Sequence, residues 1–246
     1  MKKIVYVSST VTIGIVNSPS KVLDESASMQ LTGTSYQQVK WEAERFLQEQ
    51  MHLENLPVVI VNPSTIVGAG DWRPTPPNKL IVDFMNTAGN WDWLLKLKFK
   101  EAPVWFKTGF SVVHVADVAR GIFLAGEKGA LKERYILSGD NITYLEMYRT
   151  LASILSLQRP YIYFPKRMMY ALSWFLDQCM EHPPMSYSLA KTMVDHYAYF
   201  SSQKAKEKLD YGWRPYRESL TDAVRWFLNT PLVHDNRREK LCLRYQ

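Results

Sequence analysis

The chain contains very little cysteine. Its 246 residues include only Cys179 and Cys242, without a Cys-x-x-Cys pair, so the sequence predicts neither a disulfide framework nor a zinc site. The five histidines show no metal-ligand spacing, and no Gly-x-Ser-x-Gly sequence indicates a serine hydrolase. We therefore expect no bound metal, and a reducing cytoplasm is the simplest location.

Long apolar runs are also missing. No uninterrupted run approaches the ~18 residues that a membrane-spanning helix needs. The apolar stretch after Met1-Lys2-Lys3 ends at Ser8, so a strand explains it better than a signal peptide. The net charge of +6 suits anionic small molecules such as nucleotides as well as it suits nucleic acid or anionic lipid. We expect no nucleic-acid partner.

Short apolar runs alternate with segments of helical spacing, which is typical of a parallel α/β sheet. The predicted strands are residues 4–7, 57–61, 111–115 and 133–138. The predicted helices between them are residues 36–51 and 116–128. The hydrophobic content of 46% is ample for a buried core, in one large domain or two small ones.

The last third of the chain is helical and aromatic. Thr143 and Glu146 have the spacing of a capping box, which predicts a helix that continues through Leu157. Residues 168–176 are apolar on nearly every face, and we expect burial rather than lipid contact because charged residues end the run early. Residues 91–100 mix aromatic side chains with lysines, which suits either a membrane surface or a segment covering a substrate pocket.

The pair Tyr36 and Lys40 is the most informative feature of the sequence. Residues four apart on a helix share a face, so the ammonium group would lie beside the phenol and favour the phenolate. Ser9 follows the first apolar run, where a strand would open into a site. Taken alone, Tyr-x-x-x-Lys also occurs by chance in many helices that carry out no chemistry.

Several other segments resemble the extended short-chain dehydrogenases, the NAD-dependent epimerase/dehydratase family. The run Val61-Asn62-Pro63-Ser64-Thr65-Ile66-Val67-Gly68-Ala69-Gly70-Asp71 closely resembles the stretch that follows the catalytic helix in that family. Further similar segments occur in the same order at residues 113–119, 135–139, 200–205, 209–215 and 223–227. The resemblance is nearest to the dihydroflavonol-reductase-like and hopanoid-associated sugar epimerase branch.

The resemblance implies an α/β fold, namely the C-terminal part of a Rossmann-type parallel sheet with a smaller, mostly helical substrate-binding lobe. We expect residues 1–70 to form the catalytic part of an incomplete Rossmann domain. Residues 71–246 would be mainly the substrate-binding lobe, with residues of about 108–128 returning to pack on the sheet.

Family members begin with a glycine-rich strand–turn–helix unit that holds the cofactor pyrophosphate, and this chain starts after that unit. Gly68-Ala69-Gly70 does not replace it, because Arg73 stands where the third glycine belongs. Pro74, Pro76 and Pro77 also argue against the helix that should follow.

The resemblance implies the roles of the site residues. Tyr36 would be the general acid/base and would also contact the cofactor. Lys40 would favour the phenolate and bind the nicotinamide ribose, and Ser9 would position the substrate oxygen. Thr10 is the alternative to Ser9. Pro63, Ser64 and Thr65 would lie beside the nicotinamide, or they form a simple turn after the strand. Arg73 would bind an anionic group of the substrate, or it is a solvated surface residue.

These roles predict an NAD(P)-dependent oxidoreductase or epimerase that acts on a sugar nucleotide or a related hydroxyl or carbonyl substrate. The cofactor would be NAD or NADP. Two alternatives stay open: a truncated, non-catalytic remnant or scaffold that binds no dinucleotide, and a membrane-surface protein with peripheral lipid contact. A homodimer through the helix with Tyr36, or a separate chain supplying the missing N-terminal half, would be the protein partner.

Overall fold

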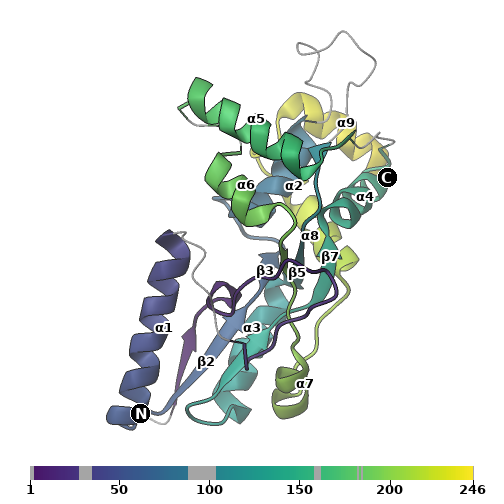
Figure 1. Cartoon of the computed structure of the whole chain (residues 1–246). Helices are drawn as coiled ribbons and strands as arrows, with labels where there is room; N and C mark the ends of the chain where they lie inside the picture. The colour runs from purple at the N-terminus through teal and green to yellow at the C-terminus, as the bar shows by residue number, and fades with distance from the viewer. Residues whose placement is uncertain are drawn as a thin grey trace. The chain divides into compact units, whose positions relative to one another are not determined.

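The computed structural model describes residues 3–27, 35–87, 104–157, 162–181, 183 and 185–245. The chain divides into two compact units, each assembled from three segments (Figure 1). Unit 1 consists of Met1–Ile66, Gly109–Asn141 and Tyr197–Tyr216. Unit 2 consists of Val67–Thr108, Ile142–His196 and Arg217–Gln246.

The main sheet of unit 1 has three parallel strands in the order β1-β2-β6. They are β1 (Ile4–Val7), β2 (Val58–Pro63) and β6 (Arg134–Leu137). Every residue of the central strand β2 is buried, as expected for a strand covered on both faces. Ile4 and Val7 of β1 are 38% and 42% exposed, since β1 pairs with β2 alone in this sheet. The α/β fold predicted from the sequence is confirmed.

Four further strands form a second sheet, in which β5 is central. They are β3 (Thr65–Val67), β5 (Gly109–His114), β7 (Asp140–Thr143) and β9 (Tyr197–Ala198). The order is β3-β5-β7, and β9 pairs with β5 in parallel. In unit 2, the short strands β4 (Val104–Trp105) and β8 (Ile162–Tyr163) pair in parallel.

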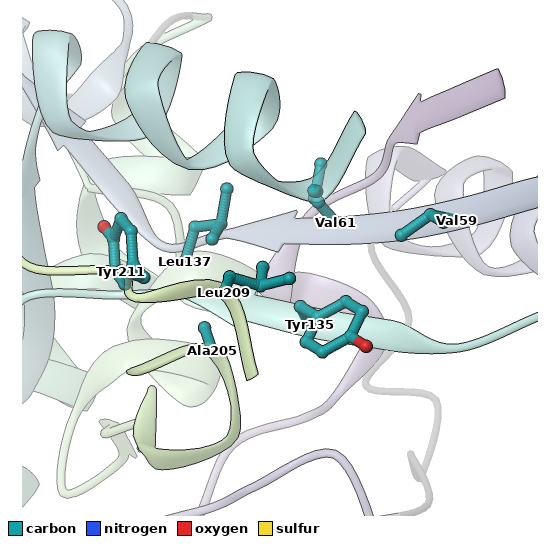
Figure 2. Packing of buried hydrophobic residues seen from close by; sticks show 8 residues of the cluster. Val59, Val61, Tyr135, Leu137, Ala205, Leu209 and Tyr211 are labelled. Atoms are coloured by element: carbon teal, nitrogen blue, oxygen red, sulfur yellow. The ribbon is translucent and has the colours of Figure 1, made fainter. Parts of the chain in front are cut away.

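Helices cover both faces of the main sheet. Met51 of α1 (Ser35–Leu53) packs against Val58 and Ile60 on one face of β2. The alternate residues of β2 point to the other face, toward α3 (Val115–Lys128) and α7 (Gln203–Leu209). The core there is shown in Figure 2 and consists of Val59, Val61, Ala125, Tyr135, Leu137, Ala205, Leu209 and Tyr211.

The segment after α7 is fixed to unit 1 by two carboxylates. Asp117 on α3 accepts hydrogen bonds from the backbone N–H of Arg214 at 2.9 Å and from its guanidinium group at 2.9–3.2 Å. Asp140 accepts from Trp213 Nε1 at 3.0 Å and from the N–H of Tyr216 at 2.8 Å. Burial raises the pKa of Asp117, but the hydrogen bonds from Arg214 outweigh it, so the pKa is lowered overall.

Unit 2 is mainly helical. Its helices are α2 (Pro76–Thr87), α4 (Tyr144–Ile154), α5 (Lys166–Cys179), α6 (Tyr187–Met193), α8 (Tyr216–Leu228) and α9 (Asp235–Tyr245). The predicted capping box is confirmed: Glu146 N–H donates to Thr143 Oγ1 at 3.2 Å and Thr143 N–H donates to Glu146 Oε2 at 2.7 Å. The helix ends at Ile154, three residues before the predicted Leu157.

The prediction that residues 168–176 are buried is wrong. In α5 only Met169 and Ser173 are buried, whereas Trp174 and Phe175 are 56% and 57% exposed. Of the helices that the structure describes, none has the length and apolar character that crossing a bilayer would require. Residues 91–100, the other candidate for membrane contact, lie outside the described residues.

Candidate active site at the carboxyl ends of β1 and β2

The turn after β1 carries the two candidate hydroxyls. Ser8 N–H donates to Val61 O at 2.8 Å and so continues the pairing of β1 with β2. Ser9 has an extended backbone and caps a short 3₁₀ helix, η1 (Thr10–Thr12), with its Oγ accepting from Val11 N–H at 3.3 Å. Thr10 is only 6% exposed, whereas Ser9 is half-buried. Ser9 is therefore the more accessible hydroxyl of the pair.

Tyr36 and Lys40 lie in the first two turns of α1, one turn apart. The Tyr36 side chain is 56% exposed and Lys40 is half-buried. Gln37, next to Tyr36, donates through Nε2 to Val11 O at 3.2 Å. This bond holds the first turn of α1 against η1, so the turn with Tyr36 and the turn with Ser9 are neighbours.

A buried carboxylate on α1 makes a second connection that sequence reasoning missed. Glu44 is 3% exposed and lies one turn beyond Lys40 on the same face. Its Oε2 accepts hydrogen bonds from Ser8 Oγ, from Thr12 Oγ1 at 2.9 Å and from Asn62 Nδ2 at 2.9 Å. One carboxylate thus joins α1 to both ends of the turn that carries Ser9.

The charge of Glu44 is balanced by Arg134 on β6. Arg134 Nη1 lies 3.3 Å from Glu44 Oε1, and the rest of the guanidinium group donates to the carbonyls of Glu25 and Ala27. Asn62 Nδ2 also donates to Ser9 O at 3.1 Å. Buried charges are tolerated when they are paired and hydrogen-bonded, and the Glu44 carboxylate and the Arg134 guanidinium group meet that condition. We call Ser8, Thr12, Glu44, Asn62 and Arg134 the Glu44 cluster.

The end of β2 presents a buried hydroxyl that lacks a partner. Ser64 N–H donates to Leu137 O at 3.1 Å, which fixes its backbone. Ser64 is 9% exposed, yet its Oγ makes no hydrogen bond to any group that the structure describes. Pro63 is buried and Thr65 is half-buried. An unsatisfied buried hydroxyl calls for an explanation, and a bound ligand is one that fits a strand end opening into a site.

Arg73 and the Gly68-Ala69-Gly70 loop belong to unit 2, whereas the preceding site residues belong to unit 1. Arg73 is exposed. The interpretation of Pro76 as a barrier to a helix is wrong, because α2 begins there; proline is tolerated in the first turn of a helix.

A pyrophosphate does not fit at the start of α2. Asp71 Oδ2 already accepts from Thr75 N–H and Thr75 Oγ1, both at 2.8 Å, and from Asn78 Nδ2 at 2.9 Å. An anion would meet this carboxylate rather than free N–H groups. The interpretation that this loop does not replace the glycine-rich unit therefore has a structural reason.

His114 has a structural role at the end of β5. It is 4% exposed, and its Nδ1 accepts from Ala116 N–H at 3.1 Å as the N-cap of α3. Within the described parts of the chain, no group of three or more histidine, cysteine, aspartate or glutamate side chains is arranged to hold a metal ion.

The comparisons with known proteins agree on one family. A family model described as male sterility protein matches residues 1–88. The chain is 28% identical over 239 residues to a putative dihydroflavonol 4-reductase from Synechocystis, covering 93% of this chain and 65% of that protein. It is 25% identical over 246 residues to sterol demethylase protein B from Methylococcus capsulatus, covering 95% and 68%. The chain thus spans about two thirds of the length of these relatives.

Solved structures share the fold. The crystal structure of gox2253 is 31% identical with a TM-score of 0.73, covering 92% of this chain and 66% of that one. A nucleoside-diphosphate-sugar epimerase from Pseudomonas aeruginosa is 23% identical with a TM-score of 0.71, covering 94% and 68%. Others include dTDP-glucose 4,6-dehydratase from Bacillus anthracis in complex with NAD and RMD from Pseudomonas aeruginosa with NADPH, 16% and 14% identical. The chain belongs to the family of NAD-dependent epimerases and reductases.

Proposed function

We propose that this chain carries the proton-transfer residues of an NAD(P)-dependent oxidoreductase or epimerase of the extended short-chain dehydrogenase type. The observation that supports this most is the pair of connections between α1 and η1, from Gln37 to Val11 O at 3.2 Å and from Thr12 to Glu44 at 2.9 Å. They keep the helix turns of Tyr36 and Lys40 beside the turn of Ser9. A substrate oxygen that reached Tyr36 would therefore also be near Ser9.

In this proposal, Tyr36, Lys40 and Ser9 have different tasks. The Tyr36 phenol passes a proton to or from the substrate oxygen, and Lys40 places a positive charge one turn along the same helix. The Ser9 hydroxyl donates a hydrogen bond to the same oxygen. The Glu44 cluster positions Ser9 through hydrogen bonds to Ser8, to Thr12 and to the Ser9 carbonyl. The bound nicotinamide supplies the hydride chemistry.

For the cofactor, we propose NAD or NADP, with Lys40 on the ribose and Pro63, Ser64 and Thr65 along the nicotinamide. The unsatisfied Ser64 Oγ supports this assignment, because a carboxamide group offers the partner that the described residues do not provide. The substrate class we propose is a sugar nucleotide or a related hydroxyl or carbonyl compound, in line with the sugar-nucleotide epimerase of the same fold. Arg73 is then a candidate for its anionic group.

Calorimetric titration with NADH and with NADPH tests the cofactor assignment. We expect saturable binding by the chain when a glycine-rich strand–turn–helix unit is added, fused ahead of β1 or supplied as a separate polypeptide. Ser64→Ala should weaken this binding about 2- to 10-fold, as expected for one lost hydrogen bond. Ser219→Ala is the matched control, because Ser219 is also buried with an unpartnered hydroxyl but lies in α8 of unit 2.

Equal affinities of the two variants would contradict the role of Ser64. Failure of a folded, completed chain to bind either dinucleotide would contradict the proposed function and favour the non-catalytic scaffold. Both outcomes can be read only after circular dichroism has established that the chain is folded.

We also propose a homodimer through α1. Val39, Phe46 and Leu53 recur every seven residues along this helix and are 63%, 63% and 76% exposed. Such a spacing places the three side chains in one row, which suits packing against a second copy. Phe46→Ser should convert a dimer into a monomer in analytical ultracentrifugation. Phe123→Ser, which removes a 64% exposed phenyl ring from α3, is the control and should leave the mass unchanged. A monomeric wild-type chain would refute this interface.

A further inference from the structure

Helix α5 of unit 2 exposes an almost uncharged apolar face. Its large exposed side chains are Met168, Leu172, Trp174 and Phe175, which are 52%, 40%, 56% and 57% exposed. The spacing of Met168, Leu172 and Phe175 puts these three on one side of the helix. A surface helix in water normally carries polar residues on this side. The exposed face therefore suits an apolar partner.

The fold does not require this face. The opposite side of α5 already packs into unit 2, where Met169 joins a cluster with Phe106, Ala190 and Val194. Ser173 Oγ is satisfied within the helix by Met169 O at 2.7 Å. Figure 1 shows α5 lying beside α6, which it contacts. The exposed side chains of α5 therefore do not belong to the hydrophobic core of unit 2.

Within the apolar stretch of α5 itself the charges are all positive, and the nearby carboxylate of Asp195 lies 3.7 Å from Lys166 Nζ. Residues 166–176 include Lys166 and Arg167 and contain no carboxylate. Both cations are exposed at the start of the helix, and exposed Lys191 lies on the adjoining α6. Asp177, after this stretch, accepts a hydrogen bond from Tyr187 N–H at 2.8 Å and so faces α6.

We propose that α5 docks on the surface of a membrane that contains anionic lipid. Met168, Leu172 and Phe175 would enter the boundary between headgroups and acyl chains, with α5 parallel to the surface. Trp174 would lie at the headgroup level, which tryptophan favours. Lys166 and Arg167 would meet lipid phosphates with their aliphatic stems on the apolar side. This docking does not depend on the chemistry proposed for Tyr36.

Vesicle flotation of the purified 246-residue chain tests the proposal. The chain should float with phosphatidylcholine vesicles that contain phosphatidylglycerol and bind less to phosphatidylcholine alone. Raising the salt to about 1 M should weaken binding to the anionic vesicles, because charges are then screened beyond ~3 Å. Phe175→Ser should weaken partition by about tenfold, because it removes one inserted ring. Arg167→Ser should reduce the preference for anionic vesicles.

The control is again Phe123→Ser, which removes a ring of similar exposure, 64% against 57% for Phe175, outside α5 and should float like the wild type. The exposed Cys179 at the end of α5 offers a second readout: in a Cys242→Ser background, a polarity-sensitive dye on Cys179 should shift to shorter wavelength on vesicle binding. The proposal is overturned by a wild-type chain that does not float, by flotation insensitive to Phe175→Ser, or by an unchanged dye spectrum on bound chain. Self-association abolished by Phe175→Ser in a chain that does not float would assign the face to a second copy instead.

Discussion

Replacing Tyr36 by phenylalanine should lower turnover by about 10²- to 10⁴-fold, the range typical for removal of a general acid/base. The ring and its packing stay, and only the proton-carrying oxygen is lost. Tyr36 is 56% exposed, so its substitution should not affect folding. Initial rates should be measured on the chain completed with the glycine-rich unit, together with calorimetric binding of NADH and NADPH.

The loss should fall mainly on kcat, with a smaller change in cofactor affinity, because Lys40 keeps its proposed ribose contact when the Tyr36 hydroxyl is removed. Tyr163→Phe is the matched control: Tyr163 is 42% exposed but lies in β8 of unit 2, packed against Trp105. It should retain full activity. Undiminished turnover in the Tyr36 variant would refute the acid/base role.

Replacing Glu44 by alanine should lower the free energy of unfolding by about 3–5 kcal/mol, the usual effect of breaking a buried ion pair from one side. Arg134, 3.3 Å from Glu44, would keep its charge without a carboxylate partner. The Ser8 and Thr12 hydroxyls would lose their shared acceptor. Since those two residues flank Ser9, the turn with Ser9 should also loosen. Urea unfolding measures the first effect.

Glu49→Ala on the same helix is the control. Glu49 is 55% exposed and pairs with Arg45 at 3.7 Å, and exposed pairs of this kind contribute about 0.3–0.5 kcal/mol. The free energy of unfolding of Glu44→Gln should lie between those of the two alanine variants, because glutamine retains the volume and one acceptor oxygen but not the charge opposite Arg134. Similar unfolding free energies for the Glu44 and Glu49 alanine variants would show that the Glu44 cluster does not support the fold.

Local patterns in the sequence predicted the elements well. The strand expected at 57–61 is β2, and its run of buried aliphatic residues follows from cover on both faces. The helix expected at 36–51 is α1, which extends one residue earlier and two later. The capping box at Thr143 is correct because it depends on neighbours three residues apart.

The Glu44 cluster could not be predicted in the same way. Its members come from the turn after β1, from η1, α1, β2 and β6. No local pattern indicates that a carboxylate on a polar helix is buried against four distant donors. The error at residues 168–176 has a related cause. Apolar composition alone does not show whether the apolar side chains pack inside the chain. In α5 most of them are exposed.

The discontinuous composition of unit 1 affects how this protein can fold during synthesis. The strands of its main sheet all precede residue 138, but Ala205, Leu209 and Tyr211, which complete its core, come from the segment Tyr197–Tyr216. The ribosome makes two segments of unit 2 before that segment emerges. The face of the sheet that α7 covers is therefore exposed for most of the synthesis time, and strands β1 and β2, more than fifty residues apart, pair without it. Chaperone binding to the nascent chain should consequently end late, after Tyr211 has left the ribosome.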